Sequence, residues 1–358
     1  MAATTGLTIE LLLRQMVEQG ATDLHLSANL PPHLRMDDRL VPMDYPPLSG
    51  DAIKQLAYSL IAPEKVERFE RWKELDFAFS IEGLARFRAN FFMQQGYMGV
   101  AIRMLPFRIM SFEELGLPVR VVTDLCERSK GLLLITGSTG SGKTTTLASM
   151  VDYLNASRDF HILTIEDPIE YIHTSKRSII NQREVGMDTQ SFAQGLKHVL
   201  RQDPDIILIG EMRDLETIET ALIVAETGHL VLATLHTSDA VQTVNRIVDV
   251  FPAHQQNQVR VQLSLELIGV ISQQLIPKAS GRGRVLACEL LLINHAVRSL
   301  IREQKIHQLY SVIQTGQKEG MRTMNQSLYE LYMNKVISLE DALARSTDPE
   351  DLMRLMNR

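Results

Sequence analysis

Residues 131–146 read Gly-Leu-Leu-Leu-Ile-Thr-Gly-Ser-Thr-Gly-Ser-Gly-Lys-Thr-Thr-Thr, and this stretch decides the fold. The first six residues are mostly apolar, as expected of a strand in a parallel sheet that is covered on both faces. Residues 137–144 then match the phosphate-binding pattern G-x-x-x-x-G-K-[ST], and a helix is predicted to follow. Glycines let backbone N–H groups wrap around phosphate oxygens, and the helix N-terminus adds a favourable dipole. The stretch therefore predicts a nucleotide-binding α/β domain.

The predicted nucleotide site uses this loop and the first turn of the helix. Lys143 is expected to reach the β- and γ-phosphates, and the Thr144 hydroxyl to coordinate Mg²⁺. A simple glycine- and serine-rich turn with a chance lysine is the alternative, but the flanking strand and helix argue against it. ATP and Mg²⁺ are the predicted cofactors. The residues expected to bind the nucleotide are Ser138, Thr139, Gly140, Ser141, Gly142, Lys143, Thr144 and Thr145.

Composition places the chain among ordinary globular proteins. Of its 358 residues, 45% are hydrophobic and 22% charged, and the length suggests about two domains. The net charge of −6 gives no global sign of nucleic-acid binding. Two distant cysteines, Cys126 and Cys288, exclude a disulfide framework and a four-cysteine zinc site. Because neither a secretory signal nor an apolar run of membrane-spanning length is present, we expect a soluble, cytosolic protein.

The residue pattern divides the chain into two predicted domains. Residues 1–105 combine short helices with half-buried strands and predict a mixed α/β domain, and residues 106–118 predict a linker. Residues 119–358 predict a second domain whose short apolar strands alternate with helices, as in a doubly wound α/β sheet. Its strands are expected at 131–136, 161–165, 205–209 and 230–235. From about residue 255 the pattern is mostly helical, apart from a hairpin around residues 281–283.

Acidic residues follow two of the predicted parallel strands. Glu166 comes directly after the strand at 161–165, and Glu211 follows the strand at 205–209. Ligands of doubly wound sheets bind at the carboxyl ends of the strands, so both carboxylates are expected beside the phosphates. One is able to hold Mg²⁺ through water while the other orients or deprotonates the attacking water. Helix capping and surface ion pairs are the alternative roles for such acids.

Histidines and arginines form a second group of candidates. His229 precedes the strand at 230–235 and His236 follows it, although a lone histidine is more often structural than catalytic. The expectation is that His229 donates a hydrogen bond to the γ-phosphate. Arg86, Arg88 and Arg103 fall on neighbouring predicted strands. They either cover a solvated face or reach a nucleotide phosphate, in cis or from a neighbouring subunit, as arginine fingers do.

Four segments together resemble the secretion ATPases, which drive type II and type IV secretion and type IV pili. The segments 137–146, 165–171, 206–214 and 226–237 resemble the Walker A, Asp box, Walker B and His box of that family. Residues 22–25, 181–186, 200–205 and 246–252 are similar to its pilus-retraction branch, PilT/PilU. The resemblance extends from about residue 8 to residue 330. It implies a PAS-like N-terminal α/β domain and a RecA-like ATPase domain.

The resemblance also implies roles for single residues. Glu166 matches the Asp-box glutamate that activates water, and Glu211 matches the Walker B glutamate that holds Mg²⁺ through water. His229 matches the His-box residue near the γ-phosphate. Arg88 and Arg103 match two N-terminal-domain arginines that contact nucleotide. All five are expected to be catalytic.

For the whole protein, the resemblance implies a hexameric ring that hydrolyses ATP to power type IV pilus retraction and twitching motility. The implied partners are further copies of the chain, an inner-membrane pilus platform protein and a paralogous pilus ATPase. The implied location is the cytoplasmic face of the inner membrane at the pilus base. Two alternatives stay open. Residues 348–356 look somewhat like the accessory retraction ATPase of this branch, and a P-loop protein is also able to translocate nucleic acid, although the net charge of −6 argues against that.

Overall fold

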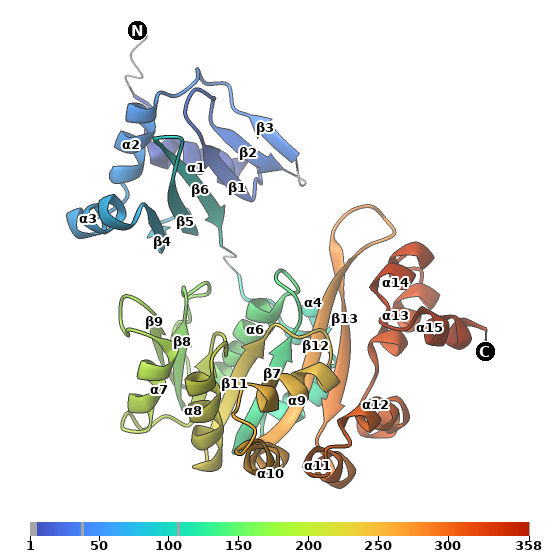
Figure 1. The fold of residues 1–358 in the computed structure, drawn as a ribbon. Coiled ribbons are helices and arrows are strands. Elements are labelled where there is room, and N and C mark those ends of the chain that lie inside the picture. The colour runs from blue at the N-terminus through green and yellow to red at the C-terminus, as the bar shows by residue number, and fades with distance from the viewer. Residues whose placement is uncertain (1–5, 37–38, 106–107, 358) are drawn as a thin grey trace. The chain divides into compact units, whose positions relative to one another are not determined.

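The computed structural model describes residues 6–36, 39–105 and 108–357 of the chain. They form two units, one running to residue 108 and including residues 168–172, the other made of residues 109–167 and 173 onward (Figure 1). Residues 106–107 of the predicted linker lie outside the described residues, as do the ends of the predicted domains at 1–5 and 358. The rest of the predicted linker contains helix α4 (Phe112–Leu115).

The first unit is an antiparallel sheet with helices against one face. The six strands lie in the order β3-β2-β1-β6-β5-β4. Alternate residues of β5, such as Phe87 and Phe91, are fully buried under the helices, while Arg88 between them faces away. The strands are β1 (Asp23–Leu26), β2 (His33–Met36), β3 (Arg39–Pro42), β4 (Glu74–Ile81), β5 (Ala85–Gln94) and β6 (Tyr97–Met104), and the helices are α1 (Ile9–Glu18), α2 (Gly50–Tyr58) and α3 (Pro63–Trp72).

The second unit contains the predicted doubly wound sheet. Its seven strands lie in the order β13-β12-β7-β11-β10-β8-β9, parallel except for β13 at one edge. The strands are β7 (Gly131–Thr136), β8 (His161–Glu166), β9 (Ile179–Glu184), β10 (Ile206–Ile209), β11 (Leu230–Leu235), β12 (Leu267–Pro277) and β13 (Arg284–Leu292). The helices up to the end of β12 are α5 (Val119–Cys126), α6 (Lys143–Ser157), α7 (Phe192–Val199), α8 (Leu215–Glu226), α9 (Ala240–Asp249) and α10 (Gln256–Glu266).

Both faces of this sheet are covered by helices. Leu134 and Val231 point to the face that carries α7 to α10, and Leu133 and Leu232 point to the face that carries α5 and α6. The central strands β7 and β11 are buried along their whole length. This explains why their sequences are continuous apolar runs rather than alternating ones.

The chain after residue 255 differs from the prediction of a mostly helical region with a short hairpin. β12 and β13 are eleven and nine residues long, and β12 joins the main sheet beside β7. The physical reason is that residues 267–276 are largely apolar and find burial on both faces of the sheet extension. Apart from α10, the predicted helices follow after β13, as α11 (His295–Arg302), α12 (Leu309–Thr315), α13 (Met324–Met333), α14 (Leu339–Arg345) and α15 (Pro349–Met356). No helix in the described parts of the chain combines the length and the apolar character that a bilayer crossing needs.

Candidate active site

The carboxyl ends of four parallel strands bring the predicted site together. Thr136, the last residue of β7, is directly opposite Leu235, the last residue of β11. Across β10, Ile209 pairs with both Ala233 of β11 and Ile165 of β8. The residues that follow these strands therefore lie along one edge of the sheet. They are Gly137 and the rest of the loop, Glu166, Glu211 and His236.

The shape of the phosphate-binding loop depends on its first glycine. Gly137 has a φ of 142°, a backbone angle that residues other than glycine rarely adopt. A Cβ at this position would lie 2.4 Å from the Gln273 carbonyl oxygen and 2.5 Å from Ser141 Oγ. Neither neighbour has room to move, because the carbonyl belongs to the adjacent strand β12 and Ser141 is buried. Gly142, with a φ of 93°, then turns the chain into α6.

Lys143 is folded over the loop that precedes it. Its ammonium group donates to the carbonyl oxygens of Gly137 at 2.8 Å and Ser138 at 3.0 Å, and the side chain is buried. Burial lowers the pKa of Lys143, and the charge of nearby Glu211 opposes this. Phosphate oxygens are stronger acceptors than these carbonyls, because they carry charge. The lysine is therefore held at the loop and is able to turn from the carbonyls to a bound phosphate.

His236 links Lys143 to Glu211. Lys143 Nζ lies 3.4 Å from His236 Nδ1, and His236 Nε2 lies 3.0 Å from Glu211 Oε1. An ammonium group only donates hydrogen bonds, so Nδ1 must accept. The ring proton then sits on Nε2 and points at the carboxylate. The imidazole therefore connects the phosphate-binding lysine with the acid that follows the neighbouring strand.

Glu211 also has a cationic partner. Arg213 Nε lies 2.6 Å from Glu211 Oε1. Burial alone would raise the pKa of Glu211, but the hydrogen bonds from Arg213 and His236 and the charge of Arg213 outweigh it and lower the pKa. The carboxylate is therefore ionised at neutral pH, as a group that holds a hydrated cation must be.

Glu166 is a buried acid at this edge, as is Glu184 at the end of the next strand, β9. The Glu166 side chain is 8% exposed and accepts from Thr164 Oγ1 at 2.6 Å and from Gln182 Nε2 at 3.2 Å. Thr164 is two residues earlier on β8, so both side chains lie on the same face of the strand. Gln182 comes from the next strand, β9. A carboxylate fixed in this way is suited to orient a water or to accept its proton.

The register of β11 contradicts the expectation that His229 lies near the γ-phosphate. The Gly131 amide donates to the His229 carbonyl oxygen at 3.0 Å, at the beginning of β7 and β11. The phosphate-binding loop is at the other end of these six-residue strands, roughly 20 Å away at about 3.3 Å per residue. His229 Nδ1 is instead near Thr227 Oγ1 and the Val224 carbonyl, at 3.1 and 3.2 Å. His236 occupies the position that was expected for His229.

The predicted arginines lie in the first unit. Arg88 on β5 and Arg103 on β6 are directly opposite each other on the exposed face of its sheet. Arg103 Nε donates to the buried Asp23 at 2.7 Å, and Arg88 Nη2 lies 3.8 Å from Asp76. Arg86 donates from Nε and Nη2 to the Ile169 carbonyl, at 3.1 and 3.0 Å, within the same unit. The two candidate arginines are thus brought together, and Arg103 is held by Asp23, which also accepts from Thr22 Oγ1 at 2.7 Å.

The oxygen donors at the sheet edge suit Mg²⁺. The Thr144 hydroxyl is in the first turn of α6, and Glu211 and Glu166 supply carboxylates at the same edge. Within the described residues there is no group of three or more histidine, cysteine or acidic side chains arranged around a metal.

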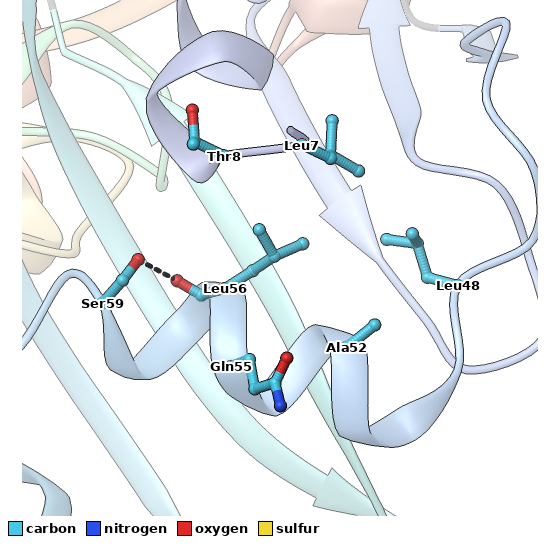
Figure 2. Close-up of a pocket in the computed structure, with 7 residues that line it drawn as sticks. All are labelled: Leu7, Thr8, Leu48, Ala52, Gln55, Leu56 and Ser59. Carbon is cyan, nitrogen blue, oxygen red and sulfur yellow. Dashed lines mark hydrogen bonds between the residues drawn. The ribbon is translucent and has the colours of Figure 1, made fainter. Parts of the chain in front are cut away.

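A pocket of about 210 Å³ lies in the first unit. It is between the start of α1 and one face of α2, and none of its seven lining side chains is charged (Figure 2). Ser59 Oγ is turned to the Leu56 carbonyl of its own helix, at 2.7 Å. The lining side chains therefore supply no positive charge that would attract a phosphate.

Comparison with known proteins identifies the family. A family model described as type II/IV secretion system protein matches residues 5–344. The chain belongs to the type II/IV secretion system protein family. The type IV pilus retraction ATPase PilT of Pseudomonas aeruginosa is 49% identical over 340 residues, which cover 95% of this chain and 98% of that relative. PilU of the same organism, a type IV pilus ATPase, is 42% identical over 347 residues, covering 97% and 90%.

A solved structure supports the same placement within the secretion family. The crystal structure of the pilus retraction motor PilT with bound ADP matches with a TM-score of 0.91 and 52% identity, covering 97% of this chain and 99% of that one. The prediction of a mixed α/β N-terminal domain followed by a RecA-like ATPase domain is thereby confirmed. The prediction of an ATP-hydrolysing enzyme of the pilus-retraction class is confirmed as well.

Proposed function

We propose that this chain is a motor that uses ATP hydrolysis to retract type IV pili, and that it works as a hexamer with Mg²⁺-bound ATP. One observation carries the chemical part of the proposal: Lys143, His236 and Glu211 form a continuous chain of hydrogen bonds along the edge where the phosphate-binding loop lies. The identity to PilT over nearly the whole of both chains supports the retraction part.

The residues of the site divide the work of hydrolysis. Residues 138–145, which include Lys143, bind the phosphates. Thr144 would hold Mg²⁺ directly, and Glu211 would hold it through water. The metal, when bound, neutralises charge that develops on the phosphates. Glu166 orients the attacking water and accepts its proton. His236 couples the position of Lys143 to that of Glu211, because its ring contacts both side chains at once.

Arg88 and Arg103 are proposed to complete the nucleotide site, either in the same chain or across a subunit boundary. Their adjacent positions on β5 and β6 would let both guanidinium groups contact one polyphosphate. Each hydrolysis step would then move an N-terminal unit, and the motion would act on an inner-membrane pilus platform protein. The proposed location is the cytoplasmic face of the inner membrane at the pilus base, where a paralogous pilus ATPase is a further candidate partner.

The first test is the ATPase rate of the purified chain together with its mass in solution. We expect a hexamer-sized, Mg²⁺-dependent ATPase whose rate falls by about 10² or more in Glu166→Gln. Glu219→Gln is the matched control, because it neutralises an exposed carboxylate on α8 and should leave the rate unchanged. An inactive monomer would contradict the motor proposal and point to an accessory ATPase that depends on a partner.

Mixing variants tests whether the arginines act across subunits. Arg88→Ala and Glu166→Ala are each expected to be inactive alone. If Arg88 serves the neighbouring subunit, some sites in mixed rings contain both intact groups and activity returns. Mixed rings without any recovery would contradict a role for Arg88 in trans.

A further inference from the structure

The phosphate-binding loop lines a cavity together with residues that have no role so far. This cavity has a volume of about 200 Å³, and residues 138–141 of the loop form one wall. The opposite wall comes from much later in the chain. Gln274 and Leu275 contribute from β12, Arg284 is the first residue of β13, and Arg345 is the last residue of α14.

The backbones that carry the two arginines are fixed by packing. Arg284 pairs with Pro277 next to the turn of the β12–β13 hairpin, and Gln274 Nε2 donates to the Arg345 carbonyl at 3.4 Å. Ala342, one turn before Arg345, is fully buried in a hydrophobic cluster with Ile276 of β12. Figure 1 shows α14 beside this hairpin. The arginines are therefore held at the loop by the fold of the same unit, and their exposed side chains are free to adjust.

The charge of the cavity is entirely positive. No acidic side chain lines it, and neither Arg284 nor Arg345 makes an ion pair with any residue that the structure describes. By contrast, Arg213 and Arg322 of the same unit pair with Glu211 and Glu330. Two unpaired guanidinium groups across a small cavity from a phosphate-binding loop match a polyanion, because guanidinium binds phosphate oxygens in pairs.

We propose that Arg284 and Arg345 bind the polyphosphate of the nucleotide held by the loop of the same chain. The ligand class is a nucleoside di- or triphosphate, and the inference rests on nucleotide binding by residues 138–145. The C-terminal helices thereby become part of the nucleotide site. When hydrolysis removes phosphate charge, the electrostatic attraction on Arg345 of α14 and on Arg284 of the hairpin would weaken. This effect would add to any change at Glu166 and Glu211.

Calorimetric titration of the full-length chain with ADP tests this proposal. In Arg284→Gln and in Arg345→Gln we expect the Kd for ADP to rise on the order of tenfold, since each substitution removes a charged hydrogen-bond partner. The affinity should also depend less steeply on salt concentration. Arg282→Gln is the matched control, because it makes the same charge change at the tip of the same hairpin and does not line the cavity.

The outcomes separate this inference from the proposed function. Melting curves without nucleotide show whether each variant is folded, and both positions are exposed, so unchanged melting is expected. A Kd within twofold of wild type in both cavity variants overturns the proposal, and so does an equal loss in Arg282→Gln. Failure of the unaltered chain to bind ADP would instead overturn nucleotide binding itself.

Discussion

Glu289 is a deeply buried acid of the second unit, and its side chain titrates near neutral pH. It lies on β13, is 3% exposed, and accepts hydrogen bonds from the Ala240 amide at 2.9 Å and the Met324 amide at 3.4 Å. These amides belong to the first residues of α9 and α13. Burial raises the pKa of Glu289 to about 7, against the two amide donors and with help from the charge of Asp239.

The raised pKa makes the protein less stable as the pH rises. Between the ordinary value of 4.5 and about 7, the folded chain holds the proton more tightly than the unfolded chain. The contribution of Glu289 to the free energy of unfolding is therefore fully present below 4.5 and is lost as the pH rises through about 7. Each pKa unit is worth about 1.4 kcal/mol, so the loss amounts to roughly 3 kcal/mol.

Replacing Glu289 with glutamine removes this titration and keeps one oxygen acceptor for the helix N-termini. Urea unfolding followed by circular dichroism from about pH 5 to pH 8 gives the free energy of unfolding for each chain. As the pH rises across this range, the free energy of unfolding of Glu289→Gln should increase by roughly 3 kcal/mol relative to that of wild type. Glu340→Gln, an exposed acid on α14, should follow the wild-type curve. Parallel curves for wild type and Glu289→Gln would refute the reasoning.

Three further outcomes are expected from the geometry of the site. Gly137→Ala should lower the free energy of unfolding by about 2 kcal/mol and abolish the rise in melting temperature on adding ADP, because its Cβ would lie 2.4 Å from a carbonyl oxygen. His236→Ala should lower kcat at least about tenfold while His229→Ala keeps it, and equal losses in steady-state assays would contradict the assignment of His236. Asp23→Asn should lower kcat severalfold, since Asp23 positions Arg103, and an unchanged kcat would argue against that positioning role.

Much of the second unit follows from local sequence. The loop at 137–144 has a fixed pattern, and the strands beside it are short apolar runs that only a sheet covered on both faces explains. Once those strands are taken as parallel, Glu166 and Glu211 must share an edge with the loop, as the structure bears out. The general rule that ligands bind at the carboxyl ends of strands was therefore sufficient for both acids.

The same rule would have found His236. Both histidines border the strand Leu230–Leu235, but only the residue after the strand lies at the carboxyl edge. The resemblance favoured His229, while the direction of the strand favours the other residue. The error came from assigning a role by the position of a motif and not checking which end of the strand it occupies. Pairing of Leu230 with Gly131 settles the direction.

The contribution of the C-terminal region could not be predicted from periodicity. Whether residues 267–277 form a helix or a strand depends on the open edge of β7, a partner more than a hundred residues earlier in the chain. Only when β12 takes that edge does the hairpin bring Arg284 to the phosphate-binding loop, and only the packing of Ala342 against the hairpin brings Arg345 there. No local sequence pattern marks these two arginines, because only the tertiary structure brings them to the cavity. If they contact nucleotide, the site is built from both ends of the second unit, and the last helices act on catalysis as well as on stability.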